Sequence, residues 1–442
     1  MSAPRLTRAA LAEAGTPLPA SPVRIVHIGV GAFHRAHQAW YTARAGDGWG
    51  IAAFTGRDAA VAQRLAPQDG LYTLVERGPD ADRFEVVGSI AEVHASTEIA
   101  RFLELFASPS TAVVTVTVTE QGYHLRPDGA LDLSSPAIAA DVRALYAGGH
   151  PTTPIGRIVR GLAERRRAGA GPIAIVSCDN LPANGDRLRA AVVDLAEAAG
   201  LTGVADRASF VSTSVDRITP HELDIDAVER ATGWRDEAPV VTEPFSDWTL
   251  SGEFPAGRPR WEDAGARFVD DIEPFEQRKL LLLNGGHLQL AFQGLLRGHE
   301  TIADAMRDAD CLRALDDFWA EAARTVGPAV DPEAYCAALR ERFENPRIAH
   351  RLAQIAADTV TKLRLRIVPV VEAERAAGRD AAGALSVVAA WSRCVAEGVL
   401  PDGAVRDAPA EAVATLVSGV DATDASAIAA AAATLKESVH TL

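Results

Sequence analysis

Cysteine is scarce in this chain of 442 residues, and its four copies are widely spaced. They form no metal-ligand pattern, so neither a disulfide scaffold nor a metal site is expected. The chain also lacks the apolar region of a signal peptide, and no segment stays free of charge over a membrane-spanning length. We therefore expect reduced cysteines, no metal and a soluble cytoplasmic protein. The cysteines are Cys178, Cys311, Cys336 and Cys394.

Lysine is even rarer: of 44 basic residues, only Lys279, Lys362 and Lys436 are lysines. Arginine keeps its proton in proteins, whereas lysine can be tuned to lose it. Lys279 precedes a run of four leucines (280–283), and an amine placed beside so much apolar surface favours a chemical role. The alternative is a surface lysine whose methylene stem covers apolar residues while its amine stays in water.

Positive charge is in deficit as well, because the formal net charge is −15 at pH 7. An acidic surface repels nucleic acids and anionic lipids, so neither is expected as a partner. With 48% hydrophobic residues the chain can bury a large core, and its length suggests two or three domains. We expect a small-molecule ligand, and a monomer or small homo-oligomer.

Short apolar runs alternate with helical stretches in residues 1–265, and this alternation predicts a mostly parallel, doubly wound α/β sheet. Two runs separated by turn residues, 71–76 and 84–90, predict a hairpin. In residues 266–442 helical periodicity dominates, which predicts an all-α second domain. The other expected strands are 23–28, 50–55, 112–118, 172–177, 208–214 and 239–243, and the expected helices include 32–45, 152–168 and 186–199.

The first apolar run ends in Gly29-Val30-Gly31, directly before a predicted helix. A strand, a glycine turn and a helix N-terminus in this order are typical of a site for the pyrophosphate of a dinucleotide. His34 stands where the third glycine of the usual motif is expected, so the pattern also fits a simple tight turn. The residues expected to contact the cofactor here are Gly29, Gly31, Ala32 and Phe33.

An acidic side chain after the second strand often accepts the ribose hydroxyls of NAD. Asp58 stands there and favours NAD, whereas the neighbouring Arg57 would accept the 2′-phosphate of NADP. Alternatively, both side chains cap the next helix. Glu120 and Tyr123 follow the run 112–118, where such a sheet places ligand contacts, and we expect them near the nicotinamide.

Three basic or imidazole side chains follow the glycine turn. We expect them to line the cofactor site or to cap the helix rather than to bind a metal. They are His34, Arg35 and His37.

Asp271 marks a helix start shortly before Lys279. At about 100° per residue, an α-helix separates Lys279 from Asn284 by about 140° and from His287 by about 80°. The three polar side chains then project from one side of the helix, and the leucines pack into the core.

Two glycines interrupt this segment. Within a helix, Gly285 and Gly286 each cost roughly 1 kcal/mol relative to alanine. A substrate or a nicotinamide that approaches the helix backbone closely would explain them. Alternatively, Asn-Gly-Gly ends one helix before another begins.

Six segments together resemble the mannitol dehydrogenase family, the polyol-specific long-chain dehydrogenases. The resemblance covers residues from about 22 to about 370 and implies a Rossmann-like first domain, an all-α second domain and metal-independent NAD(P) chemistry on a secondary alcohol. The segments are GVGAFHRAHQ (29–38), TEQGYHL (119–125), SCDNLPANG (177–185), FVSTSVDRITP (210–220), TEPFSDW (242–248) and KLLLLNGGH (279–287).

The resemblance also implies residue roles. By motif position, Lys279 matches the general acid/base, Asn180 and Asn284 match two amides that hold the reacting oxygen, and His287 matches a substrate-positioning histidine. Asp216 matches an acidic residue linked to proton movement.

Physical chemistry is consistent with these roles. A lysine at its ordinary pKa of about 10.4 is a poor base at neutral pH, but burial lowers that pKa. Two amides stabilise a developing alkoxide without a metal. Taken singly, Asn180 also fits a turn residue, and Asp216 fits an ion-pair partner of Arg217.

Substrate choice is expected to depend on the segment 357–369, where Lys362 and Arg366 are candidate contacts to hydroxyls, a carboxylate or a phosphate. The leading expectation is interconversion of a mannitol-like polyol and its ketose with NAD, or with NADP. The alternatives are a fructuronate or tagaturonate reductase, a sugar-phosphate enzyme such as mannitol-1-phosphate 5-dehydrogenase, an aldolase with Lys279 as its Schiff base, and an NAD-binding sensor without activity.

Overall fold

The computed structural model describes residues 3–56, 58–220, 223–357 and 359–400. The chain divides into two compact units, Met1–Glu273 and Pro274–Leu442, here called the first and the second unit. The division falls at the start of α10 (Glu273–Arg278), a few residues past the expected boundary of 265/266. The alanine-rich run 426–439, expected to be helical, lies outside the described residues.

The first unit is built on an eight-stranded sheet with the order β11-β10-β8-β7-β6-β1-β2-β5. The six strands from β8 to β5 are parallel, and chain order reverses between β1 and β6, as in a Rossmann fold. The expected doubly wound sheet is therefore confirmed. The strands are β1 (Val23–Ile28), β2 (Gly50–Phe54), β5 (Ile90–His94), β6 (Val113–Val116), β7 (Ile173–Ser177), β8 (Ala208–Asp216), β10 (Asp247–Ser251) and β11 (Arg267–Phe268).

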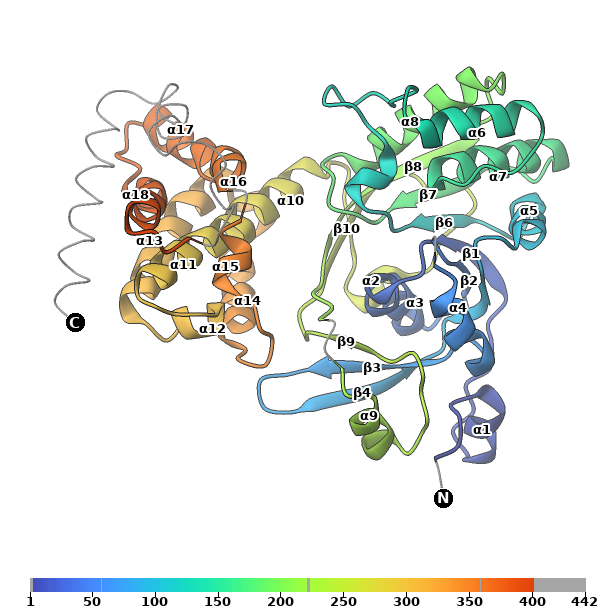
Figure 1. Cartoon of the computed structure of the whole chain (residues 1–442), viewed down its shortest axis with the longest axis horizontal. Coiled ribbons are helices and arrows are strands. Elements are labelled where there is room, and N and C mark those ends of the chain that lie inside the picture. Colours follow the sequence, from blue (N-terminus) through green and yellow to red (C-terminus); the bar gives the residue numbers. More distant parts are fainter. Residues whose placement is uncertain (1–2, 57, 221–222, 358, 401–442) are drawn as a thin grey trace. The chain divides into compact units, whose positions relative to one another are not determined.

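The central strands are apolar throughout because helices cover both faces of the parallel sheet. In β1, Val26 and Ile28 pack on one face with Phe102, while Ile25 packs on the other face with Trp248. Figure 1 shows α7 and α8 over the first of these faces and α2 and α3 over the second. The helices of this unit are α1 (Arg8–Glu13), α2 (Ala32–Ala36), α3 (Gln38–Ala45), α4 (Ala60–Leu65), α5 (Ile99–Ala107), α6 (Pro136–Tyr146), α7 (Pro154–Ala168), α8 (Asn184–Ala198) and α9 (Ile225–Thr232).

The expected hairpin is present as β3 (Tyr72–Arg77) and β4 (Asp82–Val87), but it forms a separate small sheet. β9 (Val240–Thr242) pairs with β3 and belongs to that small sheet, so its expected place in the main sheet was wrong. The single helix expected over 32–45 is also wrong, because His37 has φ −122° and ψ −92° and separates α2 from α3.

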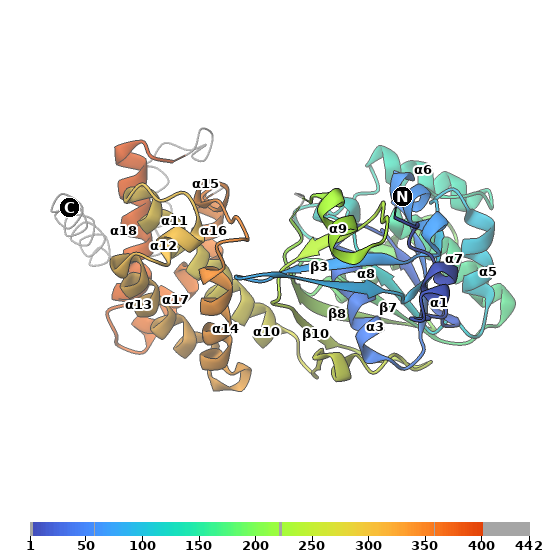
Figure 2. The same cartoon turned by 90° about the horizontal axis from the view of Figure 1, so that it is seen from below.

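The described part of the second unit is helical, as expected. Its centre is α11, which packs against α12, α13, α15 and α18 (Figure 2). A π-helical turn, η4, joins α10 to α11 in one continuous helical run. The elements are η4 (Lys279–Asn284), α11 (Gly285–Leu296), α12 (Ile302–Ala305), α13 (Ala309–Val326), α14 (Pro332–Glu344), α15 (Leu352–Ile355), α16 (Thr359–Arg366), α17 (Val368–Ala376) and α18 (Ala382–Glu397).

One buried carboxylate, Glu374 of α17, connects this helix to α13. Glu374 is 1% exposed and accepts hydrogen bonds from Arg379 at 2.6 and 2.8 Å and from Arg324 at 3.2 and 2.6 Å. These hydrogen bonds lower the pKa of Glu374 to about 2, and Arg379 makes the largest contribution.

Glu374→Gln should lower the free energy of unfolding at pH 7 by about 2 kcal/mol, since the half-exposed arginines screen part of the interaction. Because the pKa is depressed in the folded state, the wild-type advantage is full above the ordinary value of 4.5 and is lost as the pH falls toward 2. Urea unfolding of both proteins between about pH 7 and pH 3.5 measures this difference. A difference that stays constant over this range would contradict the ion-pair explanation.

Candidate active site

The glycine turn lies where chain order reverses in the main sheet. Gly29 has φ +101°, and a Cβ on it would collide with the carbonyl oxygen of Thr117 at the end of β6. Its N–H and that of Val30 both donate to Phe54 O, at 2.9 and 3.0 Å. The turn is therefore fixed between β2 and β6, at the edge where ligands bind in this kind of sheet.

The second glycine of the turn has a different character. Gly31 has an ordinary extended conformation, and a Cβ on it would meet nothing nearer than Gly29 O at 3.8 Å. Packing thus leaves open space at Gly31. Ala32 and Phe33, which begin α2, are partly buried against the core.

The three side chains expected to line the cofactor site or cap the helix are buried and contact protein groups. His34 is fully buried and stacks on His27 of β1, with ring centroids 3.3 Å apart, and burial drives its pKa well below the ordinary value. Arg35 donates to Gly31 O and Ala238 O. His37, also buried, contacts the backbone through its Nε2, 3.2 Å from the carbonyl oxygen of Asp247. His34 and His37 thus contact β1 and β10 of the main sheet, whereas Arg35 contacts the glycine turn and the segment before β9.

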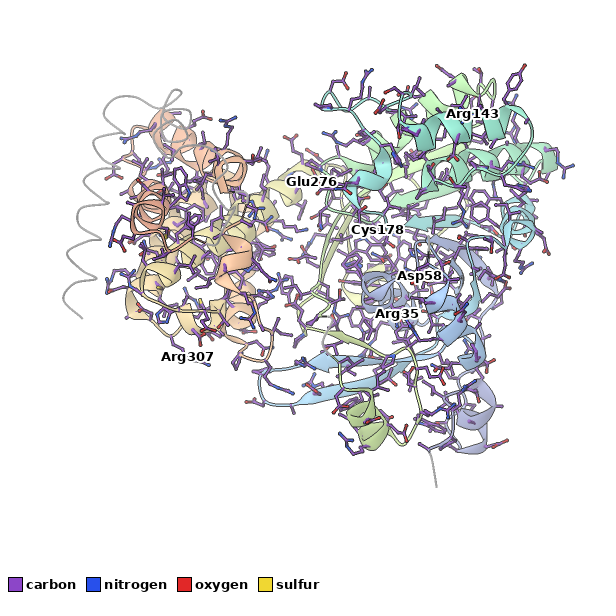
Figure 3. The ribbon with its side chains drawn as sticks, viewed as in Figure 1. Arg35, Asp58, Arg143, Cys178, Glu276 and Arg307 are labelled. Atoms are coloured by element: carbon purple, nitrogen blue, oxygen red, sulfur yellow. The ribbon has the colours of Figure 1, made fainter. Side chains whose placement is uncertain are left out.

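The two acidic candidates are exposed. Asp58 Oδ1 accepts the backbone N–H of Ala60, the first residue of α4, at 2.8 Å, but the N-cap position belongs to Ala59 and no side chain among the described residues caps this helix (Figure 3 labels Asp58). Arg57 lies outside the described residues. Glu120 is exposed on the short helix 120–123. Tyr123 is fully buried, and its hydroxyl donates to Asp179.

The loop after β7 is held by two residues that sequence reasoning missed. Asn184 donates to Asp179 O at 3.1 Å and to Thr213 O at 2.9 Å, and it accepts Thr213 N–H at 2.8 Å. Asp179 accepts the hydroxyl of Tyr123, and burial raises the pKa of its carboxyl. Asn180 lies between these anchors and is exposed. The available signal was the turn-forming sequence of 178–185, whose structural asparagine is Asn184.

Asp216 ends β8 and is 8% exposed, opposite Asp247 of β10. The alternative interpretation makes it the ion-pair partner of Arg217. The structure instead pairs the Arg217 guanidinium with Glu76 at 3.4 Å and places it over the ring of Trp40.

In the second unit, Lys279 and Asn284 are the first and last residues of η4. A π-helix bonds residues five apart, and here Gly285 N–H donates to Leu280 O. The assumption of a regular α pitch was therefore wrong, because the wide turn brings residues five apart closer in direction than the angle of about 140° in an α-helix. Lys279 and Asn284 are both partly buried, and the leucines 281–283 are buried as expected.

Both interpretations of the glycine pair were wrong. The helix runs on through Gly285 and Gly286, and the groups that approach it are protein side chains. A Cβ on Gly285 would lie 2.6 Å from the ring of Phe318, and a Cβ on Gly286 would lie 2.7 Å from Trp319 Nε1. The glycines admit the aromatic residues of α13 to the helix backbone.

His287 and Arg366 lie near Asn284 within this unit. Arg366 Nη1 is 3.4 Å from Asn284 O, and burial lowers the pKa of its guanidinium to about 10. His287 stacks on Phe343 at 4.5 Å, and its Nε2 is buried with no hydrogen-bond partner. Burial, helped by the charges of His350 and two arginines, keeps the pKa of His287 well below its ordinary value. The imidazole is therefore neutral.

Lys362 has a structural contact. Its ammonium donates to Ile355 O at 3.0 Å and to Ala357 O at 2.5 Å, the carbonyls at the end of α15. Lys362, the second residue expected to contact the substrate, thus places its positive charge at a helix C-terminus.

One group in the described residues has the composition of a metal site. His299, Asp308 and Cys311 have ligand atoms within 4.8 Å of one another. However, Asp308 caps α13 by accepting the N–H of Asp310 and Cys311. The Arg297 guanidinium, 3.8 Å from Asp308, would also oppose a cation. The group is explained as a helix cap.

Comparison with known proteins agrees with this architecture. Residues 23–263 match the mannitol dehydrogenase Rossmann domain, and residues 271–425 match the mannitol dehydrogenase C-terminal domain. D-arabinitol 4-dehydrogenase of Ralstonia nicotianae is 37% identical in an alignment 434 positions long, which covers 92% of this chain and 90% of the relative.

Two solved structures are similar over nearly their whole length. A D-sorbitol dehydrogenase in substrate-free form has a TM-score of 0.86 at 27% identity and covers 98% of this chain and 99% of its own. Mannitol 2-dehydrogenase of Pseudomonas fluorescens, in a ternary complex with NAD and D-mannitol, has a TM-score of 0.74 at 31% identity, with 99% and 98% covered.

The fold and these matches define an oxidoreductase with a Rossmann domain and a helical C-terminal domain. The chain belongs to the mannitol dehydrogenase family. Within the described residues, no helix has the length and apolar content needed to cross a membrane.

Asn184→Ala should lower the free energy of unfolding by about 2–4 kcal/mol, because three buried backbone groups lose their partner. The matched control is Asn180→Ala in the same loop, where the exposed side chain should change stability by no more than about 0.5 kcal/mol. Urea unfolding measures both variants. Equal effects would show that Asn184 is not the anchor of this loop.

Proposed function

We propose that this protein is a nicotinamide-dependent, metal-independent dehydrogenase that interconverts an open-chain polyol and its ketose. The observation that carries the proposal is the π-helical turn with Lys279 at one end and Asn284 at the other, in a member of this family. D-arabinitol, D-sorbitol and D-mannitol, for which the compared proteins are named, are all acyclic polyols. We further propose that it acts in the cytoplasm as a monomer or a small homo-oligomer.

The glycine turn fits a dinucleotide. Gly29 admits no side chain, and Gly31 leaves open space beside the start of α2, where backbone could approach a pyrophosphate. We propose NAD as the cofactor, with Gly29, Gly31, Ala32, Phe33 and Glu120 as its neighbours. Asp58 Oδ1 accepts the N–H of Ala60, and we propose that its carboxylate also accepts the ribose hydroxyls. When bound, the nicotinamide ring accepts or donates the hydride.

The chain's own residues would handle the proton. Lys279 takes the proton of the reacting hydroxyl, and Asp216 assists its movement to solvent. The side-chain amides of Asn180 and Asn284 donate to the oxygen as it gains negative charge, which stabilises the transition state more than the ground state.

A neutral His287 would position the substrate. Its buried Nε2 has no hydrogen-bond partner among the residues that the structure describes, so a substrate hydroxyl is the natural one. Because the pKa of His287 lies well below its ordinary value, its titration should not shape the activity profile above about pH 6. The pH dependence in that range should report Lys279.

A second candidate function follows from Arg366. In the described part of the chain no carboxylate pairs with this half-buried cation, whose depressed pKa has burial as its only cause. A substrate carboxylate would neutralise it, which favours a keto-uronate reductase. Lys362 would assist, although its ammonium is also held by Ile355 O and Ala357 O.

A substrate panel separates the two candidates. D-sorbitol, D-mannitol and D-arabinitol would be tested for oxidation at alkaline pH, and fructose, fructuronate and tagaturonate for reduction, each with NAD(H) and NADP(H). Absorbance of the reduced nicotinamide at 340 nm is the reading. Turnover of polyols supports the first candidate, turnover of keto-uronates alone supports the second, and no turnover would refute both.

Lys279→Ala and Lys279→Arg should each lower kcat by more than about a thousandfold, because arginine keeps the charge but cannot accept a proton at accessible pH. NAD affinity, measured by fluorescence titration, should stay within about twofold of wild type. Activity of the arginine variant near that of wild type would remove Lys279 as the proton carrier.

A further inference from the structure

Trp319 of α13 makes a hydrogen bond into the middle of the π-helical turn. Its indole Nε1–H donates to Leu282 O at 2.9 Å. The side chain is 5% exposed and packs against the Cα of Gly286, since a Cβ there would lie 2.7 Å from Nε1. The contact needs both the bare backbone at Gly286 and the ring nitrogen of the tryptophan.

The bonded carbonyl belongs to a turn with a disturbed hydrogen-bond pattern. Gly285 N–H is shared between Leu280 O, five residues back, and Leu282 O, three residues back. Leu282 is fully buried, and its carbonyl oxygen accepts the indole N–H in addition to its share of the Gly285 N–H. Loss of a donor to a buried carbonyl costs about 1–3 kcal/mol. We therefore expect the bond from the indole N–H to stabilise the wide turn against a regular α pitch.

The pitch of this turn decides how Lys279 and Asn284 lie relative to each other. In the π turn, residues five apart lie closer in direction than the angle of about 140° that separates them in a regular α-helix. Trp319 also packs on Phe343, with centroids 6.0 Å apart, and Phe343 stacks on His287. One side chain therefore supports the positions of three proposed site residues without being one of them.

We propose that Trp319 is a positioning residue, whose hydrogen bond to Leu282 O maintains the π-helical turn that aligns Lys279, Asn284 and His287. This inference rests on the proposed function for its activity readout. Phe318, the neighbour of Trp319, packs on Gly285 in the same manner but has no donor, so the polar part of the effect belongs to Trp319.

The test is Trp319→Phe, which keeps a buried aromatic ring and removes the donor. The matched control is Trp391→Phe in α18 of the same unit, because Trp391 is fully buried and its Nε1 has no hydrogen-bond partner in the described part of the chain. Both variants lose the same chemical group, and only one loses a bond.

With the substrate found in the panel, Trp319→Phe should lower kcat by about tenfold to a hundredfold, with a smaller change in KM, because misplacement of reacting groups mainly affects the transition state. The alkaline pKa in the pH profile of kcat/KM should shift, and NAD affinity should not change. Trp391→Phe should match wild type in all of these. Wild-type kcat and pH profile in Trp319→Phe, or equal losses in both variants, would overturn the proposal.

A second readout needs no activity. The chain has three lysines, so the pH dependence of their acetylation can be followed peptide by peptide by mass spectrometry. The labelling midpoint of Lys279 should move in Trp319→Phe while that of Lys362 stays in place. If the wild type turns over no substrate of the panel, the proposed function fails and this measurement alone decides: a moved midpoint supports the positioning role, and an unmoved one overturns it.

Discussion

The close approach of α13 to the helical run through η4 and α11 is the constraint on which the second unit depends. Phe318 and Trp319 occupy space that only Gly285 and Gly286 leave free. Two glycines in a helix cost roughly 2 kcal/mol in total, and burial of two aromatic rings offsets this. The glycines are thus packing residues, and the chemistry of the segment belongs to the side chains on either side of them.

Much of the first unit could be predicted from the sequence, because strands buried on both faces are continuous apolar runs and their order follows from right-handed crossovers. The position of β9 could not be predicted from the sequence. Its apolar residues fit either sheet, and its partner β3 is distant along the chain. The π-helical pitch of η4 could not be predicted from the sequence either. A π turn has no residue signature of its own, and here the partner helix supplies the deciding contact through Trp319.

The third glycine of the dinucleotide motif is missing here, but its structural role, close packing of helix and strand, is retained. That glycine normally lets the helix approach the first strand closely. Here His34 occupies the position, and its flat ring lies 3.3 Å from that of His27, so close packing is achieved by stacking. His27 in turn contacts the hydroxyls of Thr115 and Thr117. Burial lowers the pKa of both imidazoles, so two stacked rings carry no repulsive charge.

The contacts of the buried arginines explain why lysine is rare in this chain. Arg165 is buried and donates to five backbone carbonyls, and Arg35 and Arg217 likewise bind carbonyls in the interior. An ammonium has three donors and loses its proton when buried, so lysine could not replace these planar, permanently charged groups. The same argument limits what composition can predict. Lys362 and Lys279 are two of only three lysines, yet the amine of Lys362 binds the carbonyls at the end of a helix. Only the neighbours of each amine distinguish a structural lysine from a general base.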